Sequence, residues 1–146
     1  MKKSILTIVT IVMLSITNLF ANSTEVSSKV LREFEKEYAT AKDASWEINK
    51  NYVKVTFVNV DQVMSVYYGT DGTKLATSRN IRSNQLPIKL QVDLKKIQQK
   101  SWISDLFEFY SENESGYYVT LENADEKMIY RSLEGGAWEV FSRERK

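Results

Sequence analysis

Glutamate side chains are the groups in this sequence that come nearest to a catalytic arrangement. Two carboxyl groups about 5–10 Å apart could act as an acid and base pair on a glycosidic bond. Spacing along the chain does not bring two carboxyl groups together, and runs of charge are typical of a solvated surface. We therefore expect charged surface here, with a small carboxylate-dependent envelope hydrolase as the alternative. The glutamates form two clusters, Glu33, Glu35 and Glu37, and Glu108, Glu112 and Glu114.

The chain contains no histidine and no cysteine. These absences exclude Ser–His and Cys–His catalysis and the ordinary zinc sites, because each of them needs an imidazole or a thiolate. They also exclude disulfides, so the fold must be stable through packing alone, even in an oxidising compartment. We expect no catalytic residue, no metal ion and no cofactor.

A glycine-rich stretch, GTDG at residues 69–72, could in principle hold a cation or a phosphate. A calcium loop needs several oxygen ligands at fixed spacing, and here Asp71 stands alone. A phosphate loop opens a helix, whereas a strand-like pattern follows Gly72. The stretch therefore predicts the tip of a β-hairpin. Gly72, and Gly136 in a matching stretch later in the chain, would supply the positive φ that such a turn needs.

Tyrosines and an arginine are the best candidates for a binding surface. Residues 53–57 alternate apolar and polar side chains with the period of a half-buried strand. If the apolar set faces the helices, Tyr52, Tyr67 and Tyr118 fall on the opposite face together with Arg131. Tyrosine and arginine on an open sheet favour protein binding. The alternative is that tyrosine is simply a residue well suited to exposed strands.

The elements that would position these residues follow from periodicity. Residues 26–41 have the apolar spacing of an amphipathic helix, and four short strands separated by turn residues follow up to about residue 81. Pro87 then opens a segment with conflicting signals, and its helix propensity favours a helix over about residues 90–100. Four more strand-like runs complete the chain.

The two halves of the chain resemble each other. A shift of 64 residues sets Asp61 on Asp125 and Met64 on Met128. We interpret the halves, about residues 24–84 and 85–146, as two repeats of a helix followed by four strands. Coincidence between simple strand patterns is the alternative.

Residues 1–23 have the character of an export signal. Lys2 and Lys3 precede an apolar run from Ile5 to Phe20, and small residues follow in FANST. The run is shorter than the roughly 20 residues of a spanning helix, which favours a cleaved signal over a membrane anchor. We expect cleavage after Ala21 or Ser23, a single domain over residues 24–146, and a periplasmic or secreted location.

The charge balance limits the class of partner. The whole chain has a net charge of +1, and loss of the signal leaves 18 basic and 19 acidic residues, a net charge of −1. Nucleic-acid binding needs a basic stripe, and binding to anionic lipid needs a polybasic patch. We expect neither nucleic acid nor membrane as a partner after signal cleavage, and the oligomeric state stays open.

Several stretches together resemble a known family. They are FEKEYATAKDASWE, YVKVTF, LPIKLQVDLKK, WISDLFE, GYYVTLENADEKMIY and WEVF, and they cover nearly all of residues 30–142. In this order they resemble the small exported PepSY-like proteins of Bacteroidetes, which share the fold of the β-lactamase-inhibitor protein. The Leu-Pro entry to the second helix and the YYVTLENAD strand are the most specific parts.

The resemblance implies an α+β fold made of a tandem repeat of a helix plus a four-stranded antiparallel meander. The strands would form one curved sheet with the helices on its convex side. In the inhibitor, the concave face and the hairpin tips grip the target enzyme, although the inhibitor's disulfides cannot exist here. We expect an exported, non-catalytic module that binds a protein or peptide through Tyr52, Tyr67, Tyr118 and Arg131, an envelope hydrolase being one candidate partner. A structural, self-associating envelope protein is a further alternative.

Overall fold

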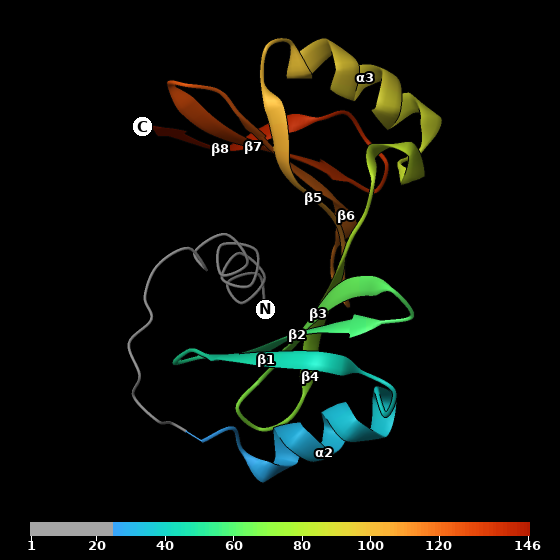
Figure 1. The fold of residues 1–146 in the computed structure, drawn as a ribbon, viewed down its shortest axis with the longest axis vertical. Coiled ribbons are helices and arrows are strands. Elements are labelled where there is room, and N and C mark those ends of the chain that lie inside the picture. Colours follow the sequence, from blue (N-terminus) through green and yellow to red (C-terminus); the bar gives the residue numbers. More distant parts are fainter. Residues whose placement is uncertain (1–24) are drawn as a thin grey trace.

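The computed structural model describes residues 25–146, so the expected signal segment 1–23 lies outside the described residues. This part of the chain has an α+β fold in which a helix precedes each group of four strands (Figure 1). The elements are α2 (Ser28–Glu37), β1 (Lys42–Ile48), β2 (Val53–Asn59), β3 (Gln62–Tyr68), β4 (Lys74–Asn80), a 3-10 turn (Ser83–Gln85), α3 (Ile88–Gln98), β5 (Trp102–Ser111), β6 (Ser115–Glu122), β7 (Glu126–Leu133) and β8 (Glu139–Arg145).

The eight strands form one antiparallel open sheet in the order β1 to β8, so each strand pairs with its neighbours in the sequence. Six of the seven connections between strands are therefore local, and the seventh, from β4 to β5, contains α3. Figure 1 shows α2 and α3 at opposite ends of the molecule, with the sheet between them. No helix within residues 25–146 is long and apolar enough to cross a membrane.

Helix α2 forms because its apolar residues recur on one side and its first turn is capped. The Ser27 hydroxyl accepts a hydrogen bond from the backbone N–H of Val30, which satisfies one of the free donors at the helix start. Val30 and Phe34 are buried against β2 and β3. The helix is shorter than the predicted 26–41, because the chain leaves helical geometry at Tyr38.

Helix α3 resolves the conflicting signals of the segment after Pro87. Proline occupies the cap position, where its missing N–H costs nothing, and the helix starts directly after it at Ile88. Leu90 and Leu94, four residues apart, are buried against β5 and β6. The helix therefore begins two residues before the predicted start at residue 90, and it ends at Gln98.

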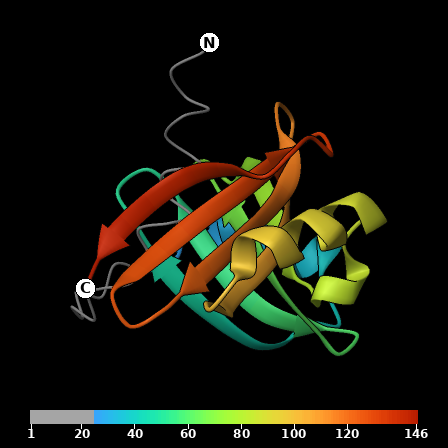
Figure 2. The same cartoon turned by 90° about the horizontal axis from the view of Figure 1, so that it is seen from above.

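Both helices pack on the same face of the sheet, as the strand register shows. Val66 lies beneath α2 and pairs with Thr77, which pairs with Tyr110, which pairs with Ser115. Ser115 and Val119 are four residues apart on β6 and so point to the same face, and Val119 lies beneath α3. Figure 2 shows the sheet from above, with α3 lying against one side of it. The other face carries a third buried cluster of its own.

The positive φ predicted for a hairpin glycine is found at the predicted residue in the first half of the chain and at a different residue in the second half. Gly72 has a φ of 90°, as predicted. In the β7–β8 turn the positive φ falls on Glu134 (50°) and Gly135 (74°). The prediction for Gly136 was therefore wrong by one residue, because its backbone N–H closes the turn by donating to the Leu133 carbonyl.

Candidate functional site

The candidate site is the sheet face opposite the two helices, which we call the open face. Alternation along β3 and β6 sends Val66, Tyr68 and Val119 toward the helices, and sends Tyr67 and Tyr118 to the open face. Tyr52, directly before β2, joins the same cluster. The structure therefore brings the three predicted tyrosines together on one face.

The expected exposure of these tyrosines was wrong. Tyr52, Tyr67 and Tyr118 expose only 5%, 2% and 2% of their surface. The physical reason is that aromatic rings on adjacent strands cover one another. The ring centroids of Tyr52 and Tyr67 are 5.9 Å apart, and Tyr118 stacks on Phe107 at 5.3 Å.

We call this cluster the aromatic floor. Its members are Tyr52, Tyr67, Ala76, Phe107, Phe109, Tyr118 and Ile129, with Leu75 and Phe141 packed against them. It is assembled from strands of both halves of the sheet, so it joins the first four strands to the last four. Its tyrosines are therefore too buried to contact a partner over a large area. Their role would be to support the more exposed side chains that do so.

Arg131 is the predicted residue that does reach toward solvent. It lies opposite Tyr118 on β7, its Nε donates to Glu139 at 2.7 Å, and its guanidinium carbon lies 5.1 Å from the centre of the Phe141 ring. Its side chain is about a quarter exposed, so part of the guanidinium remains accessible to solvent at the margin of the aromatic floor. Tyr118 donates to Glu114 at 2.7 Å.

Burial decides the protonation state of two floor tyrosines, Tyr67 and Tyr118. Burial raises the pKa of Tyr118, and the neighbouring Glu114 carboxylate raises it further. Burial also raises the pKa of Tyr67, with Tyr52 acting in the same direction and a hydrogen bond with Ser78 acting against it. Both phenols therefore stay protonated at neutral pH, and they can donate hydrogen bonds but cannot accept protons.

A row of polar side chains, which we call the polar strip, runs beside the floor on the same face. Its hydroxyls bond to one another, since Thr56 and Ser65 lie 2.9 Å apart. The strip continues through the Asn80 amide, which donates to Asp105 at 3.1 Å. The strip consists of Thr56, Ser65, Ser78, Asn80, Asp105 and Thr120. It gives the open face a hydrogen-bonding side next to its apolar side.

Asp105 is the carboxylate with the most unusual surroundings on this face. Burial raises its pKa, while the Leu106 backbone N–H, the Lys127 and Lys54 charges and the Asn80 amide act in the opposite direction. Lys54 itself pairs with Glu47 at 3.1 Å, and no cation of residues 25–146 forms an ion pair with Asp105. Its negative charge is therefore incompletely compensated.

Replacing Asp105 by asparagine should stabilise the protein at neutral pH. Because the pKa of Asp105 is raised in the folded state, its contribution to stability is greatest below the unfolded pKa and is lost as pH rises through the folded pKa. Asparagine keeps the acceptor for Asn80 and removes the charge. Urea unfolding at pH 7 and pH 3 measures the effect, and an advantage of Asp105→Asn that is larger at pH 3 would contradict it.

Trp102 is a functional candidate that the sequence reasoning did not single out. It is 52% exposed at the start of β5. The Lys146 ammonium lies 5.1 Å from its ring centre and pairs with Glu122 at 2.9 Å. Alternation in WISDLFEF was the available signal, since it sends Ile103 to the helix side and Trp102 to the open face.

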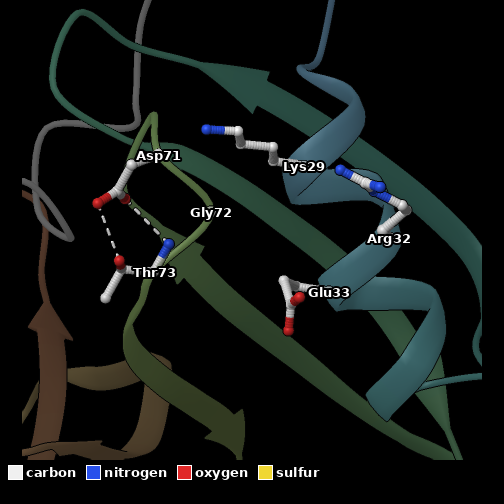
Figure 3. Close-up of a pocket in the computed structure, with 6 residues that line it drawn as sticks. All are labelled: Lys29, Arg32, Glu33, Asp71, Gly72 and Thr73. Atoms are coloured by element: carbon white, nitrogen blue, oxygen red, sulfur yellow. Dashed lines mark hydrogen bonds between the residues drawn. The ribbon is translucent and has the colours of Figure 1, made fainter.

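The GTDG stretch is a hairpin tip, as predicted. The two carboxylate oxygens of Asp71 accept hydrogen bonds from the backbone N–H and the hydroxyl of Thr73, at 3.0 and 2.9 Å (Figure 3). Lys29 and Arg32 of α2 line a pocket of about 370 Å³ beside it, together with Glu33. Asp71 is thus occupied in holding the turn, and no group of metal-ligating side chains occurs within residues 25–146.

The two glutamate clusters lie on different elements. Glu33, Glu35 and Glu37 are exposed on α2, whereas Glu108 is on β5 and the others are in or next to the turn after it. Glu37 pairs with Lys74 at 2.6 Å, and Glu108 pairs with Arg79 at 2.5 Å. Glu37 and Glu108 therefore form ion pairs at the surface, as expected for a charged surface.

Comparison with known proteins identifies the fold. A predicted periplasmic protein of Bacteroides eggerthii superposes with a TM-score of 0.73 at 13% identity, over 83% of this chain and 89% of the other. A BLIP-like protein of Bacteroides fragilis gives 0.67 at 17%, over 85% and 89%. A DUF2874 family protein of Bacteroides uniformis gives 0.71 at 13%, over 83% and 90%.

No protein-family model matches the sequence, and no curated protein matches it. At these identities, the likeness to solved structures concerns the fold and not the activity. The similarity nonetheless spans most of each chain and includes a BLIP-like protein. The chain therefore has a BLIP-like α+β fold with an open antiparallel sheet.

Proposed function

We propose that this protein is an exported, non-catalytic binding module that holds a protein or peptide on its open face. The observation that carries the proposal is the composition of that face. An aromatic floor lies beside a polar strip, on the side of the sheet that neither α2 nor α3 covers. Such a surface combines rigid apolar area with fixed hydrogen-bonding groups, which is the usual composition of a specific interface.

The solved relatives support this reading by their names and by their fold. One is BLIP-like and another is a predicted periplasmic protein, which agrees with an export signal at the start of this chain. We infer on the same grounds that the chain is PepSY-like. We also infer that it is a tandem repeat, with α2 and β1 to β4 as the first unit and α3 and β5 to β8 as the second, and that both helices lie on the convex side of the sheet. A periplasmic or secreted location follows from the same proposal.

The side chains that would contact the partner stand at the rim of the open face. Trp102 is exposed at the β5 end, Lys127 lies on β7, and Arg131 is fixed over Phe141. Tryptophan and arginine are the residue types that contribute most to binding energy at protein interfaces. The tyrosines Tyr52, Tyr67 and Tyr118 would hold this rim in place from below.

Replacing Trp102, Lys127 and Arg131 together by alanine should weaken partner binding by about 100-fold or more, since two of the three are typical hot-spot residues. The measurement is capture of partners from a periplasmic extract on the immobilised protein, followed by titration of the recovered partner. Thermal unfolding must first show that the variant still folds.

The matched control replaces three exposed residues of α3, Ile88, Val92 and Lys95, by alanine. This helix lies on the other face, so the control should keep its partner. Full retention of the partner by the rim variant would refute the proposal, as would loss of the partner in the α3 control alone.

A further inference from the structure

The side of α3 that faces away from the sheet carries two aliphatic side chains that no other part of residues 25–146 covers. Leu90 and Leu94 are buried, whereas Ile88 and Val92 are 81% and 50% exposed. Residues four positions apart lie on the same side of a helix, so Ile88 and Val92 form a short apolar ridge opposite the buried leucines. We call this side the outer face of α3, and its exposed residues are Ile88, Val92, Lys95 and Lys96.

Positive charge is concentrated around this ridge. Residues 88–100 contain four lysines and one aspartate, a net charge of +3, whereas residues 25–146 as a whole have 18 basic and 19 acidic residues, a net charge of −1. The single acid, Asp93, pairs with Lys89 at 3.0 Å and with Lys96 at 2.8 Å. Lys95 and Lys100 form no ion pair within residues 25–146, so their charges can act on an external group.

The corresponding side of α2 has a different composition. The side chains opposite its buried residues are Arg32, Glu35 and Lys36, which carry charges of both signs. No large hydrophobic residue of α2 is exposed. Single exposed aliphatic residues are common on protein surfaces and need no explanation. Of the two helices, however, only the basic one carries an exposed aliphatic pair, which indicates a surface that attracts both apolar groups and positive charge.

A lipid surface fits these features better than a folded partner does. A stable protein interface buries about 800 Å² on each partner, far more than two aliphatic side chains on one helix supply. A bilayer requires no complementary shape, because aliphatic side chains enter its interface while lysine ammonium groups stay at the level of the lipid phosphates. About four lysines on one helix are enough to attract anionic lipid. Figure 1 shows α3 at one end of the molecule, where its outer face can approach a flat surface.

We propose that the outer face of α3 binds reversibly to a bilayer that contains anionic lipid. Ile88 and Val92 enter the headgroup region, and Lys95, Lys96 and Lys100 contact lipid phosphates. The proposal differs from the expectation drawn from the net charge, because a net charge of −1 averages a basic helix and an acidic remainder.

Binding through α3 is independent of the proposed binding of a protein or peptide. Both helices pack on the face of the sheet opposite the open face, so a molecule that is bound to lipid through α3 keeps its open face accessible. Either proposal can therefore fail without the other.

The first test is co-sedimentation with lipid vesicles, on the protein purified as it accumulates in the producing cell. One set of vesicles contains equal parts of phosphatidylglycerol and phosphatidylcholine, and the other contains phosphatidylcholine alone. We expect binding to the anionic vesicles at about millimolar lipid and about tenfold weaker binding to the neutral ones. The difference should disappear at about 0.5 M salt, because exposed charges are then screened.

Paired charge variants locate the binding on the molecule. Lys95→Gln combined with Lys100→Gln should weaken binding to anionic vesicles about tenfold or more. The matched control is Arg32→Gln combined with Lys36→Gln, which removes the same charge from exposed positions of α2 and should change binding by about twofold at most. All four residues are exposed, and an unchanged Tm confirms that both variants fold.

The second test identifies the side chains that enter the bilayer. With a nitroxide-labelled lipid in anionic nanodiscs, the methyl NMR signals of Ile88 and Val92 should lose intensity well before that of Ile48, an exposed isoleucine on β1. Ile88→Ser combined with Val92→Thr should weaken binding about fivefold, because it removes the apolar contribution and keeps the lysines.

Four results would overturn the proposal. The protein could bind neither kind of vesicle at several millimolar lipid, or bind both equally, as it would through a retained apolar segment at residues 5–20. The α2 control could weaken binding as much as the α3 variant. Finally, the signal of Ile48 could be affected as strongly as that of Ile88.

Discussion

Replacing Tyr118 by alanine should lower the free energy of unfolding by about 3–5 kcal/mol, the range found when a buried aromatic residue is truncated. Its ring stacks on Phe107 and meets the edges of Phe109 and Phe141 at centroid distances of 6.0 and 5.7 Å. Alanine would leave a cavity between three rings from two other strands, β5 and β8. Urea unfolding followed by tryptophan fluorescence measures the loss.

The matched control is Tyr118→Phe, which keeps the ring and removes only the hydroxyl that donates to Glu114. Because a single hydrogen bond contributes about 0.5–1.5 kcal/mol, this variant should be several-fold less destabilised. A loss below about 1 kcal/mol for Tyr118→Ala would mean that the ring is an exposed surface contact, as the sequence alone predicts.

Replacing Gly116 by alanine should have the second large effect, about 2–4 kcal/mol of destabilisation, through overpacking in the sheet. A Cβ on Gly116 would lie 2.3 Å from the Ser132 carbonyl oxygen and 3.1 Å from the Leu133 Cα. Both atoms belong to the backbone of the adjacent strand, so β6 and β7 would have to separate at this point. Urea unfolding at pH 7 measures the difference from the unaltered protein.

Gly135→Ala is the comparison for Gly116. A Cβ on Gly135 meets nothing within 4 Å, and the cost there comes only from a φ of 74°. That cost should be about 1 kcal/mol. If the two variants were equally destabilised, close strand approach at Gly116 would not be the reason for its glycine.

These two predictions separate folding from binding on the open face. The aromatic floor stabilises the sheet. If a floor variant fails to bind its partner, the failure could therefore come from unfolding or from loss of a direct contact. Trp102 and Arg131 stand further out, and their removal should affect the partner more than the fold. The proposed binding role is therefore best tested at the rim.

The sequence predicted the two helices and the eight strands because periodicity is a local property. The alternation around Tyr67 and Tyr118 also indicated the correct face of the sheet. It could not indicate their burial, which depends on which ring lies on the neighbouring strand. The pairing of Tyr118 with Phe107 is set by the β5–β6 register, and the contact with Phe141 needs β8 as well.

The contact between Gln62 and the end of β4 was outside the reach of sequence reasoning for a similar reason. Turn residues were expected between the first four strands, and no contact was predicted for the segment that follows β4. Nothing local indicates that Gln62 donates to Asn80 across 18 positions of sequence, because that contact needs β3 paired with β4. Asp105 was overlooked because burial, and not its neighbours in sequence, makes its carboxyl unusual.

The strand order has a consequence for how the molecule is assembled in time. Every strand pairs with the one made just before it, and only the β4–β5 pair must wait for an intervening helix of the chain to appear. A polypeptide that emerges N-terminus first, from a ribosome or from a translocation pore, can therefore complete α2 to β4 before β5 exists. Early local pairing of this kind shortens the time during which unpaired strand edges are open to aggregation.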